Sequence, residues 1–524
     1  MGMNDINLLG EQSRRHFLKT SALLGLTAAS ASTMIGRAFA QEAVKKGGTL
    51  KIGMRGGSTT DTLNPTTYSN AVPLLIGYAI MNGLIEIDEK GVPRPELFES
   101  WEIGAGGTEW VFNVRKGVSF HNGKAMTADD ILYSLSLHTG KDSKSAIAGS
   151  LSHVKEVTKL DTHQVKITLS APDVDLHYAL SDYHILVVPE GFSDWANPVG
   201  TGAFKLESFD PGVRCVLVNA GDYWKDGRGN VERIEITVVN DIVQRMNALV
   251  AGQVDVINDV DKRAVDLFKA APGIELVQAP GGWHTIMAMQ SDVAPFNNAD
   301  FRLALKYACD REQILSALFN GFGRVGNDQP IPVSDPFFNS ELPQRAFDLD
   351  KAKFHLQKSG LADSKIVLSA SDAAYVGAVD MSVLFQASAG KAGIQVDVKK
   401  EPHDGFWSNV WLKAPFCTSY WAGRASATDM LASAYRSGAN WNETHWKSES
   451  FDKMLDAARA EVDEGKRKQL IWDMQAMLSE DGGALIPVFS DWLDAHRSHV
   501  KGHTPHSQFD LANGRLCEKV WLDA

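Results

Sequence analysis

Short apolar segments separated by polar turns recur along the chain from residue 49 onward. Thr49–Met54 alternates apolar and polar positions, which is the pattern of a half-buried strand. Further segments share its length, are rich in Val and Ile, and are bounded by Gly, Asp or Pro. We expect β-strands at Thr49–Met54, Trp110–Val114, Val165–Leu169, Ala203–Phe209, Cys215–Asn219, Arg233–Val239, Lys365–Ala370 and Ile394–Lys400.

Segments with helical periodicity lie between these strands. Phe301–Phe319 carries apolar residues near helical spacing, and Asp300 is its expected N-cap. A second stripe at i, i+4, i+7 and i+8 is formed by Leu470, Met474, Met477 and Leu478. A shorter helix is expected to end at Gly360. Because helices and strands are mixed throughout, the pattern favours α/β lobes.

Length and composition set limits on the fold and its partners. The 524 residues are too many for one core, so we expect two or three lobes. Apolar residues make up 44% and charged residues 22%, as in an ordinary globular protein. The formal charge of -12 argues against a nucleic-acid partner and against adsorption to anionic lipid.

The N-terminus carries the features of an export signal. Arg14 and Arg15 precede a short apolar stretch, and Ala38-Phe39-Ala40 fits the small-x-small rule for a cleavage site. We therefore expect residues 1–40 to be a twin-arginine signal peptide and the mature protein to be soluble and periplasmic. The alternative is an amphipathic anchor helix. The mature chain would carry 48 basic and 62 acidic residues, a charge of -14.

The four cysteines show no metal or redox spacing. Cys215, Cys309, Cys417 and Cys517 are separated by 94, 108 and 100 residues, so no CxxC motif exists. Three disulfide pairings are possible, and the sequence does not choose among them. Cys309 lies within a helical pattern, and we expect it to be a buried free thiol.

A search for catalytic motifs finds none of the common ones. The chain has no GxSxG, HExxH or GxxxxGK[ST] motif, and no GxGxxG follows a strand. Its dense histidine cluster comprises His496, His499, His503 and His506, and we interpret it as a solvated loop rather than a metal site. We therefore expect a protein without enzymatic activity, cofactor or metal.

Several ordered motifs resemble those of the family 5 extracellular solute-binding proteins. The signature block comprises Leu97–Glu102, Trp110–Val118, Phe120–Gly123 and Thr127–Ile131. The blocks that follow in order are Pro198–Phe204 with Asp222–Trp224, Ala251–Val256, Phe301–Leu305 with Asp310–Ile314, Asp350–Ala352 and Ala392–Ile394. The resemblance covers nearly all of residues 47–524.

The resemblance implies an α/β, two-lobed periplasmic binding protein with mixed sheets, an additional subdomain and a hinge. Lobe I would comprise 47–82, 198–283 and 486–524, with 83–197 as the subdomain beside it and 284–485 as lobe II. Such proteins serve ABC importers of peptides, nickel chelates and opines. The implied partners are a membrane permease and its ATPase, and we expect a monomer.

Local features of the matched blocks have scaffold interpretations. We expect Gly117, Gly123, Gly200 and Gly202 to occupy tight turns, where φ can be positive. Thr127 should cap the helix that begins at Ala128. We expect Asp310 and Arg311 to form an internal ion pair.

The resemblance also points to a ligand site around Trp421. Peptide binders of the family commonly place an Asp three residues after this tryptophan, where it pairs the ammonium of the ligand, but this chain has Arg424. The loop 371–376, where dipeptide binders place an Arg, contains none. Because guanidinium groups pair carboxylates, we expect an anionic ligand at Arg424. The alternative is that Asp429 neutralises Arg424 and that the pocket recognises only the shape of the ligand.

Further ligand contacts are expected from both lobes. They are Tyr68 and Asn70 in the first-lobe loop, Trp283 at a lobe crossover, and Tyr420, Trp421, Trp441 and Asn442 in a tryptophan-rich stretch. The sequence does not choose between a peptide, an opine and another solute. A binder of a metal chelate or a chemoreceptor ligand is one alternative function, and a secreted hydrolase is another.

Overall fold

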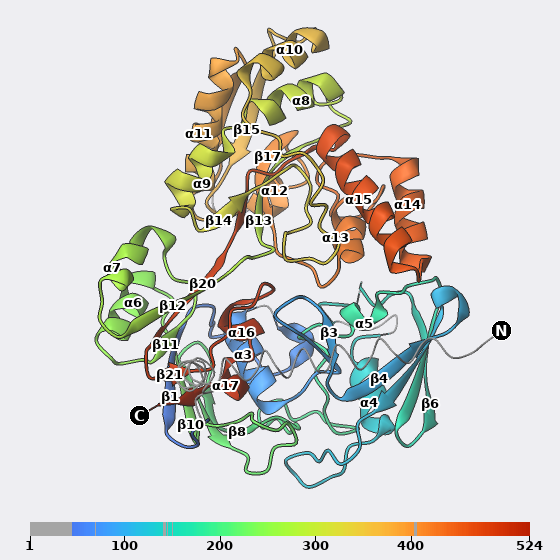
Figure 1. The fold of residues 1–524 in the computed structure, drawn as a ribbon, viewed down its shortest axis with the longest axis vertical. Helices are drawn as coiled ribbons and strands as arrows, with labels where there is room; N and C mark the ends of the chain where they lie inside the picture. Colours follow the sequence, from blue (N-terminus) through green and yellow to red (C-terminus); the bar gives the residue numbers. More distant parts are fainter. Residues whose placement is uncertain are drawn as a thin grey trace, which may run out of the picture. The chain divides into compact units, whose positions relative to one another are not determined.

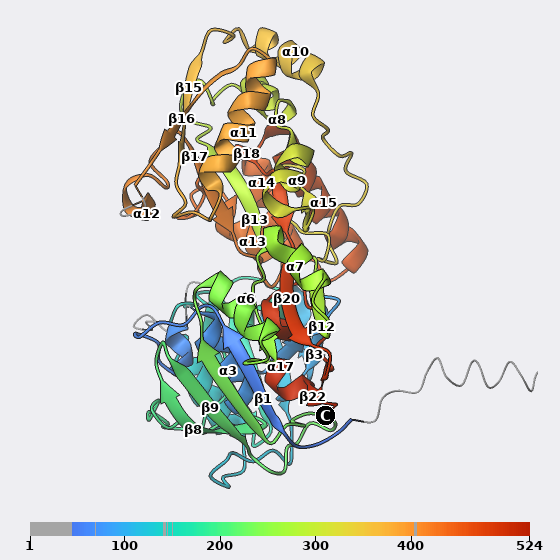
Figure 2. The same ribbon diagram turned by 90° about the vertical axis from the view of Figure 1, so that its left-hand side faces the viewer.

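The described strands form two large mixed sheets, one four-stranded antiparallel sheet and two two-stranded sheets (Figures 1 and 2). The computed structural model describes residues 44–523 except 69, 140–142, 144, 149 and 403–405. Residues 46–524 form one unit, to which the following description is confined. The expected signal peptide lies outside the described residues. No described helix is both long and apolar enough to cross a bilayer.

The first large sheet gathers strands from both ends of this unit. Its order is β12 (Ile274–Ala279), β20 (Trp492–Arg497), β11 (Val256–Ile257), β1 (Thr49–Met54), β10 (Arg233–Val238), β9 (Arg214–Asn219) and β8 (Phe204–Asp210). β1 runs parallel to β10 and β11, and the other pairings are antiparallel.

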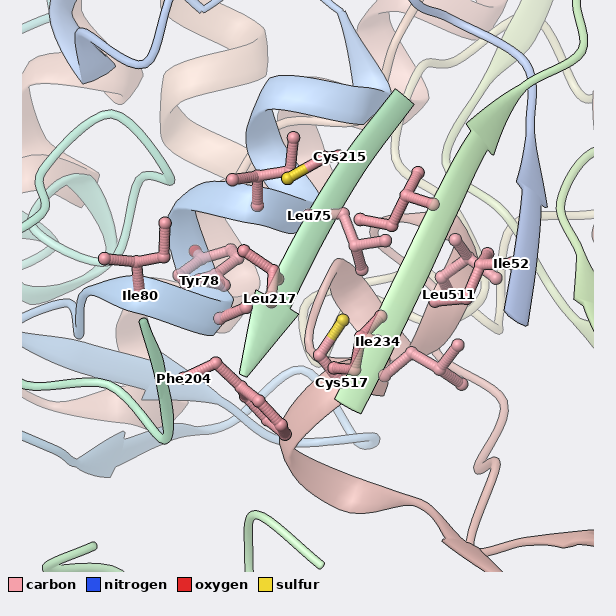
Figure 3. Packing of buried hydrophobic residues seen from close by; sticks show 14 of the residues in the cluster. Ile52, Leu75, Tyr78, Ile80, Phe204, Cys215, Leu217, Ile234, Leu511 and Cys517 are labelled. Carbon is pink, nitrogen blue, oxygen red and sulfur yellow. The ribbon is translucent and has the colours of Figure 1, made fainter. Parts of the chain in front are cut away.

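Helix α3 (Ala71–Ile80) supplies much of the core beside this sheet. Leu75, Tyr78 and Ile80 from the helix pack with Cys215 and Leu217 of β9 (Figure 3). The final turns α16 (Asp510–Asn513) and α17 (Leu516–Lys519) add Leu511 and Cys517 to the same core. The C-terminal segment is therefore an integral part of this layer.

A four-stranded antiparallel sheet forms a separate layer within residues 83–197. Its order is β4 (Phe98–Ile103), β5 (Glu109–Val114), β7 (Gln164–Leu169) and β6 (Val154–Asp161). Helix α4 (Ala128–Ser136) begins at the predicted cap Thr127, whose backbone N–H donates to Asp130 over 2.9 Å. The short helix α5 (Leu176–Ala179) contributes to the same core, and β2 (Ile85–Ile87) pairs with β3 (Pro93–Pro95).

The second large sheet contains the strands between residues 284 and 490. Its order is β14 (Gly323–Val325), β19 (Val488–Ser490), β13 (His284–Met289), β17 (Phe416–Trp421), β15 (Lys365–Ala370) and β16 (Gln395–Lys400), with β18 (Ala484–Leu485) paired to β13. One of its cores includes residues of α8 (Ala299–Tyr307), α9 (Arg311–Phe319), α10 (Leu349–Ser359) and α11 (Ala378–Lys391). Another includes α13 (Ala427–Ala434), α14 (Glu449–Ala460) and α15 (Glu464–Asp481).

Short elements complete the described fold. They are η1 (Pro65–Thr67), η2 (Ala105–Gly107), η3 (Lys262–Ala264), α6 (Ile242–Val250), α7 (Val265–Lys269), α12 (Phe406–Asn409), β21 (Val500–Lys501) and β22 (Trp521–Leu522).

The chain passes between the two large sheets at two places, β12 to β13 and β19 to β20. The crossovers run side by side, since the Ser490 N–H donates to the Trp283 carbonyl over 2.9 Å. A Cβ on Gly281 would lie 2.3 Å from the Ser490 carbonyl oxygen, so only glycine allows this approach. Short loop segments of this kind can serve as a hinge between two parts of a protein. The expected lobe limits stay predictions, and β19 continues the second sheet to Ser490.

The expected strands are present at their predicted places, within one residue at their ends. The single helix predicted at Phe301–Phe319 is wrong, because the segment folds as α8 and α9. The side chain of Asp310 accepts the Gln313 N–H over 3.0 Å and begins a new helix there. The cap of α8 is Asn298 rather than Asp300, and it accepts the Phe301 N–H over 3.1 Å.

Two other local expectations need correction. Arg311 does not pair with Asp310; it forms two hydrogen bonds of 2.7 and 2.8 Å with buried Asp328. Gly117 and Gly123 have positive φ as predicted, but Gly200 and Gly202 do not. A Cβ on Gly202 would lie 2.4 Å from the Ala79 carbonyl oxygen, so close backbone packing explains this glycine.

All four cysteines are buried free thiols, which confirms the expectation for Cys309.

Candidate functional site

The candidate site begins where β17 ends. Trp421 is the last residue of this strand, and the turn that follows it lies against the β12–β13 crossover. A Cβ on Gly282 would lie 3.0 Å from Cα of Gly423, so two glycines permit this contact. Arg424 therefore lies close to the point where the chain passes from one sheet to the other.

Two indole rings flank the Arg424 guanidinium. Its Cζ atom lies 5.2 Å from the ring centroid of Trp421 and 5.9 Å from that of Trp441. The two rings are 6.0 Å apart and inclined by 60°. The Trp441 side is open, because this residue is 50% exposed, whereas Trp421 is buried. The site thus presents a cation held by aromatic faces.

Asp429 pairs with Arg424 only loosely. The distance from Nε of Arg424 to Oδ2 of Asp429 is 3.9 Å, which is too long for a hydrogen bond. Burial raises the pKa of Asp429, against a lowering by Arg424. The guanidinium, 24% exposed, retains donors for a further anion.

Glu443 holds the indole rings of Trp421 and Trp411 in place, and the sequence analysis did not identify this residue. Its buried carboxylate accepts Nε1 of Trp421 and Nε1 of Trp411, each over 2.6 Å. Burial raises the pKa of Glu443, whereas these hydrogen bonds lower it. The signal in the sequence was an acidic residue within the tryptophan-rich stretch, where indole N–H groups need an acceptor when buried.

Asn442 has an internal role in this structure. Its Nδ2 donates to the Arg436 carbonyl over 3.2 Å and to the Trp446 carbonyl over 2.8 Å. Its Oδ1 accepts the Thr444 hydroxyl over 2.9 Å. These bonds hold the turn that presents Trp441, and direct ligand contact by Asn442 stays a prediction.

A segment that follows α5 approaches Arg424 from the first-lobe side. The Tyr183 ring stacks on His184 with centroids 4.1 Å apart and meets Phe509 edge-on at 5.6 Å. Burial raises the pKa of Tyr183, while the nearby charge of Arg424 lowers it. Burial likewise lowers the pKa of His284 to about 4, and Arg424 adds to that shift. Arg424 is therefore near residues of both the 83–197 segment and β13.

Tyr68 and Asn70 lie between η1 and α3, and their contact with a ligand stays a prediction. The Tyr68 ring is buried, its hydroxyl donates to the Leu63 carbonyl over 3.2 Å, and its carbonyl oxygen lies 2.8 Å from Nε2 of His184. Asn70 donates to Asp61 over 2.8 Å. Tyr68 and Asp61 line a surface pocket of about 390 Å³, which the other expected ligand residues do not line.

Trp283 and Tyr420 come together on the other side of β17. Successive side chains of a strand point to opposite faces, so Tyr420 points away from the face of Trp421. The rings of Trp283 and Tyr420 stack with centroids 5.6 Å apart and planes inclined by 27°. The expected aromatic site residues near β17 thus divide into two groups, Trp421 with Trp441 and Trp283 with Tyr420.

Three side chains of the histidine cluster, those of His496, His503 and His506, are buried and His499 is one-third exposed, so the expectation of a solvated loop is wrong. His503 lies 3.4 Å from Asp494 and His506 lies 3.1 Å from the Ile87 carbonyl oxygen. Within residues 44–523, outside the gaps given above, no group of three or more His, Cys, Asp or Glu side chains is arranged to hold a metal ion.

The sequence of this chain matches a family model and is similar to those of known proteins. The family model of bacterial extracellular solute-binding proteins, family 5 Middle, matches residues 92–443. Heme-binding protein A of Haemophilus influenzae is 25% identical over 468 residues, which cover 81% of this chain and 84% of that protein. The dipeptide-binding protein of Escherichia coli K12 is 23% identical over 487 residues, covering 84% and 88%.

A solved structure shares the fold. The structure of AgaA from A. tumefaciens R10 in complex with agropinic acid has a TM-score of 0.75 at 23% identity, and the match covers 91% of this chain and 99% of that one. The two-lobed α/β fold expected from the sequence is thereby confirmed.

Proposed function

Since this chain belongs to the bacterial extracellular solute-binding proteins, family 5, we propose that it is the periplasmic substrate-binding component of an ABC importer. It captures a peptide-like or small organic solute by lobe closure and delivers it to a permease and its ATPase. The similarity to a dipeptide-binding protein and to a binding protein in complex with agropinic acid supports this class of ligand. Twin-arginine export directed by residues 1–40 and a monomeric state belong to the same proposal.

The observation that carries the ligand chemistry is the Arg424 guanidinium between Trp421 and Trp441. In dipeptide binders of this family an acid at this position meets an ammonium, and a cation here would repel that group. Because the nearest Asp429 oxygen is 3.9 Å from Nε of Arg424, Asp429 does not accept a hydrogen bond from the guanidinium N–H groups. We infer that the solute has an anionic group and that free amino termini are rejected.

Aromatic residues around Arg424 would contact the rest of the solute. Trp421 is held in place by Glu443 and offers one aromatic face, while exposed Trp441 offers a second. Closure of the lobes would exclude water from Arg424 and strengthen its interaction with an anion. The role is binding rather than catalysis.

The test begins with the solute that the protein carries. The solute released from purified protein by denaturation is identified by mass spectrometry, and its affinity is measured by calorimetry for wild type and Arg424→Ala. Loss of a desolvated charge pair should cost about 2–5 kcal/mol of binding free energy. The control Arg436→Ala removes an exposed ion pair with Asp456 in the same lobe and should leave the affinity unchanged.

Two results would overturn the anionic-ligand proposal. One is equal affinity of wild type and Arg424→Ala. The other is tight wild-type binding of an unmodified dipeptide through its ammonium group. Consumption of the solute by the protein would instead indicate the hydrolase alternative.

A further inference from the structure

A cluster of five aromatic side chains lies beside the candidate site. Three strand ends or loops supply it: Trp283 precedes β13, Tyr375 follows β15, and Tyr420 is in β17. Helix α12 and the residues after it add Trp407 and Trp411. We call these five residues the aromatic platform.

Ring contacts tie the platform together. Trp283 stacks on Tyr420 at 5.6 Å and meets Tyr375 edge-on at 5.4 Å with an interplanar angle of 88°. Trp407 contacts Tyr420 at 5.8 Å and Trp411 at 5.6 Å, both near perpendicular. These are the preferred offset and edge-to-face geometries of aromatic pairs, so the rings support each other's orientation.

The rings of the platform contact one another, but two of them are incompletely covered. Trp407 is 41% exposed and Tyr420 is 37% exposed, even though both rings pack against neighbours. Large aromatic side chains that are fixed by neighbours and still open to water are typical of binding surfaces. A purely structural role explains Phe406, the buried first residue of α12, but it does not explain why the adjacent Trp407 remains exposed.

The platform is continuous with the Arg424 site. Tyr420 is joined to Trp421 by one peptide bond, and Trp283 follows Gly282, which lies against Gly423. Tyr420 and Arg424 are four positions apart, so their Cα atoms are at most about 14 Å apart. Although Tyr420 and Trp421 point to opposite faces of β17, Trp411 of the platform and Trp421 donate to the same Glu443 carboxylate, so the two groups meet at the end of the strand. A solute of modest size that lies across this strand end can therefore reach both.

We propose that the solute carries a flat aromatic group that stacks on Tyr420 and Trp407 while its anionic group meets Arg424. This inference rests on the proposed function and specifies its ligand class as aromatic acids without a free ammonium. The rigid rings would lose little conformational freedom on binding, so selectivity for flat groups follows from shape and stacking. The Arg424 site would select charge, and the platform would select the aromatic body.

The probe is an equimolar mixture of the N-acetyl derivatives of the common amino acids, each of which carries a carboxylate and no ammonium. The purified protein is incubated with the mixture and desalted, and the retained acids are quantified by mass spectrometry. We expect the Trp, Tyr and Phe derivatives to be enriched about tenfold over the Ala and Ser derivatives.

Variants separate the platform from the charge site. Tyr420→Ala and Trp407→Ala should each reduce the aromatic enrichment severalfold while retention of the other acids stays unchanged. The matched control Phe354→Ala removes an exposed aromatic side chain of α10 and should preserve the enrichment. Arg424→Ala should lower retention of all the acids together. A cooperative thermal transition shows that each variant is folded.

The outcomes distinguish the two proposals. Preference for aliphatic or polar derivatives, or an enrichment that persists in both platform variants, overturns the proposal that the solute stacks on the platform. Loss of all retained acids in Arg424→Ala supports the anionic site independently of that result. Retention of no acid overturns the aromatic-acid class. Whether the chain carries a solute at all is decided separately by the mass spectrum of the denatured protein.

Discussion

Breaking one buried ion pair should loosen the contact between two parts of the protein without unfolding either. Asp175 precedes α5 in the core that contains the four-stranded sheet, whereas Arg467 lies in α15 of another core. The carboxylate of Asp175 forms an ion pair with Arg467 and accepts a hydrogen bond from the Thr428 hydroxyl, and the two charged side chains are buried. A 2.9 Å hydrogen bond from the Val174 N–H to the Arg459 carbonyl reinforces the contact.

The magnitude follows from the burial of this pair. Removal of one partner from a buried ion pair lowers the free energy of unfolding by about 3–5 kcal/mol when the other charge stays buried without a partner. Here the protein can move from a closed form, in which the two parts are in contact, to an open form, in which they are separated and Arg467 regains water. Asp175→Asn should therefore shift the equilibrium toward the open form by about 2–3 kcal/mol. That is a change of about 30- to 150-fold in the closed-to-open ratio. Each core stays intact, so the thermal transition should move little.

The assay is solution scattering of the ligand-free protein together with calorimetry of the recovered solute. Asp175→Asn should increase the radius of gyration and weaken the apparent affinity, because a smaller fraction of molecules is ready to bind. Asp456→Asn is the control, since it removes the charge of the exposed pair with Arg436 and should change neither quantity. An unchanged radius of gyration and unchanged affinity in folded Asp175→Asn would refute the reasoning.

Four further predictions concern stability and export. Arg515→Met removes the cation that binds Glu96 and should lower the free energy of unfolding in urea by about 3–5 kcal/mol; a loss below 1 kcal/mol would contradict this. Burial raises the pKa of Asp335 to about 7, so the contribution of this carboxyl to stability should fall as pH rises from 4 to 7, and the stability difference between wild type and Asp335→Asn should change by about 1–3 kcal/mol over that range; parallel pH profiles of the two proteins would argue against it. Gly202→Ala places a methyl group against backbone and should cost about 1–3 kcal/mol by the same urea assay, whereas wild-type stability would show that the backbone can yield. Replacing Arg14 and Arg15 by Lys should retain the precursor in the cytoplasm, and normal periplasmic yield on immunoblots would oppose the twin-arginine proposal.

The periodicity of apolar residues predicted eight strands, but it did not predict strands such as β13 and β17 or the break between two helices. Strands such as Thr49–Met54 have a local signal, because alternation of burial follows from the pleat itself. The interruption before Arg311 depends on one side chain, Asp310, which serves as a cap, and on a distant partner, Asp328, which holds Arg311. A long-range ion pair leaves no periodic trace in the sequence.

The candidate site shows the same division between local and long-range information. Arg424 and Trp421 were recognisable from motif position, and the structure brings Trp441 beside them. The role of Glu443 could not be read from spacing, because it depends on two indole N–H groups that reach it from different places in the chain. Asn442 was expected at the ligand, yet its amide serves the local turn.

The position of β20 has a consequence for the order in which the protein can be built. This strand lies between β11 and β12 of the first sheet, although it follows all strands of the second sheet along the chain. During synthesis the second sheet can therefore be completed while the first still has an empty place in its interior. A copy terminated before Trp492 would display unpaired strand edges, which invite association with other chains. A translocation route that accepts only folded chains would reject every such copy.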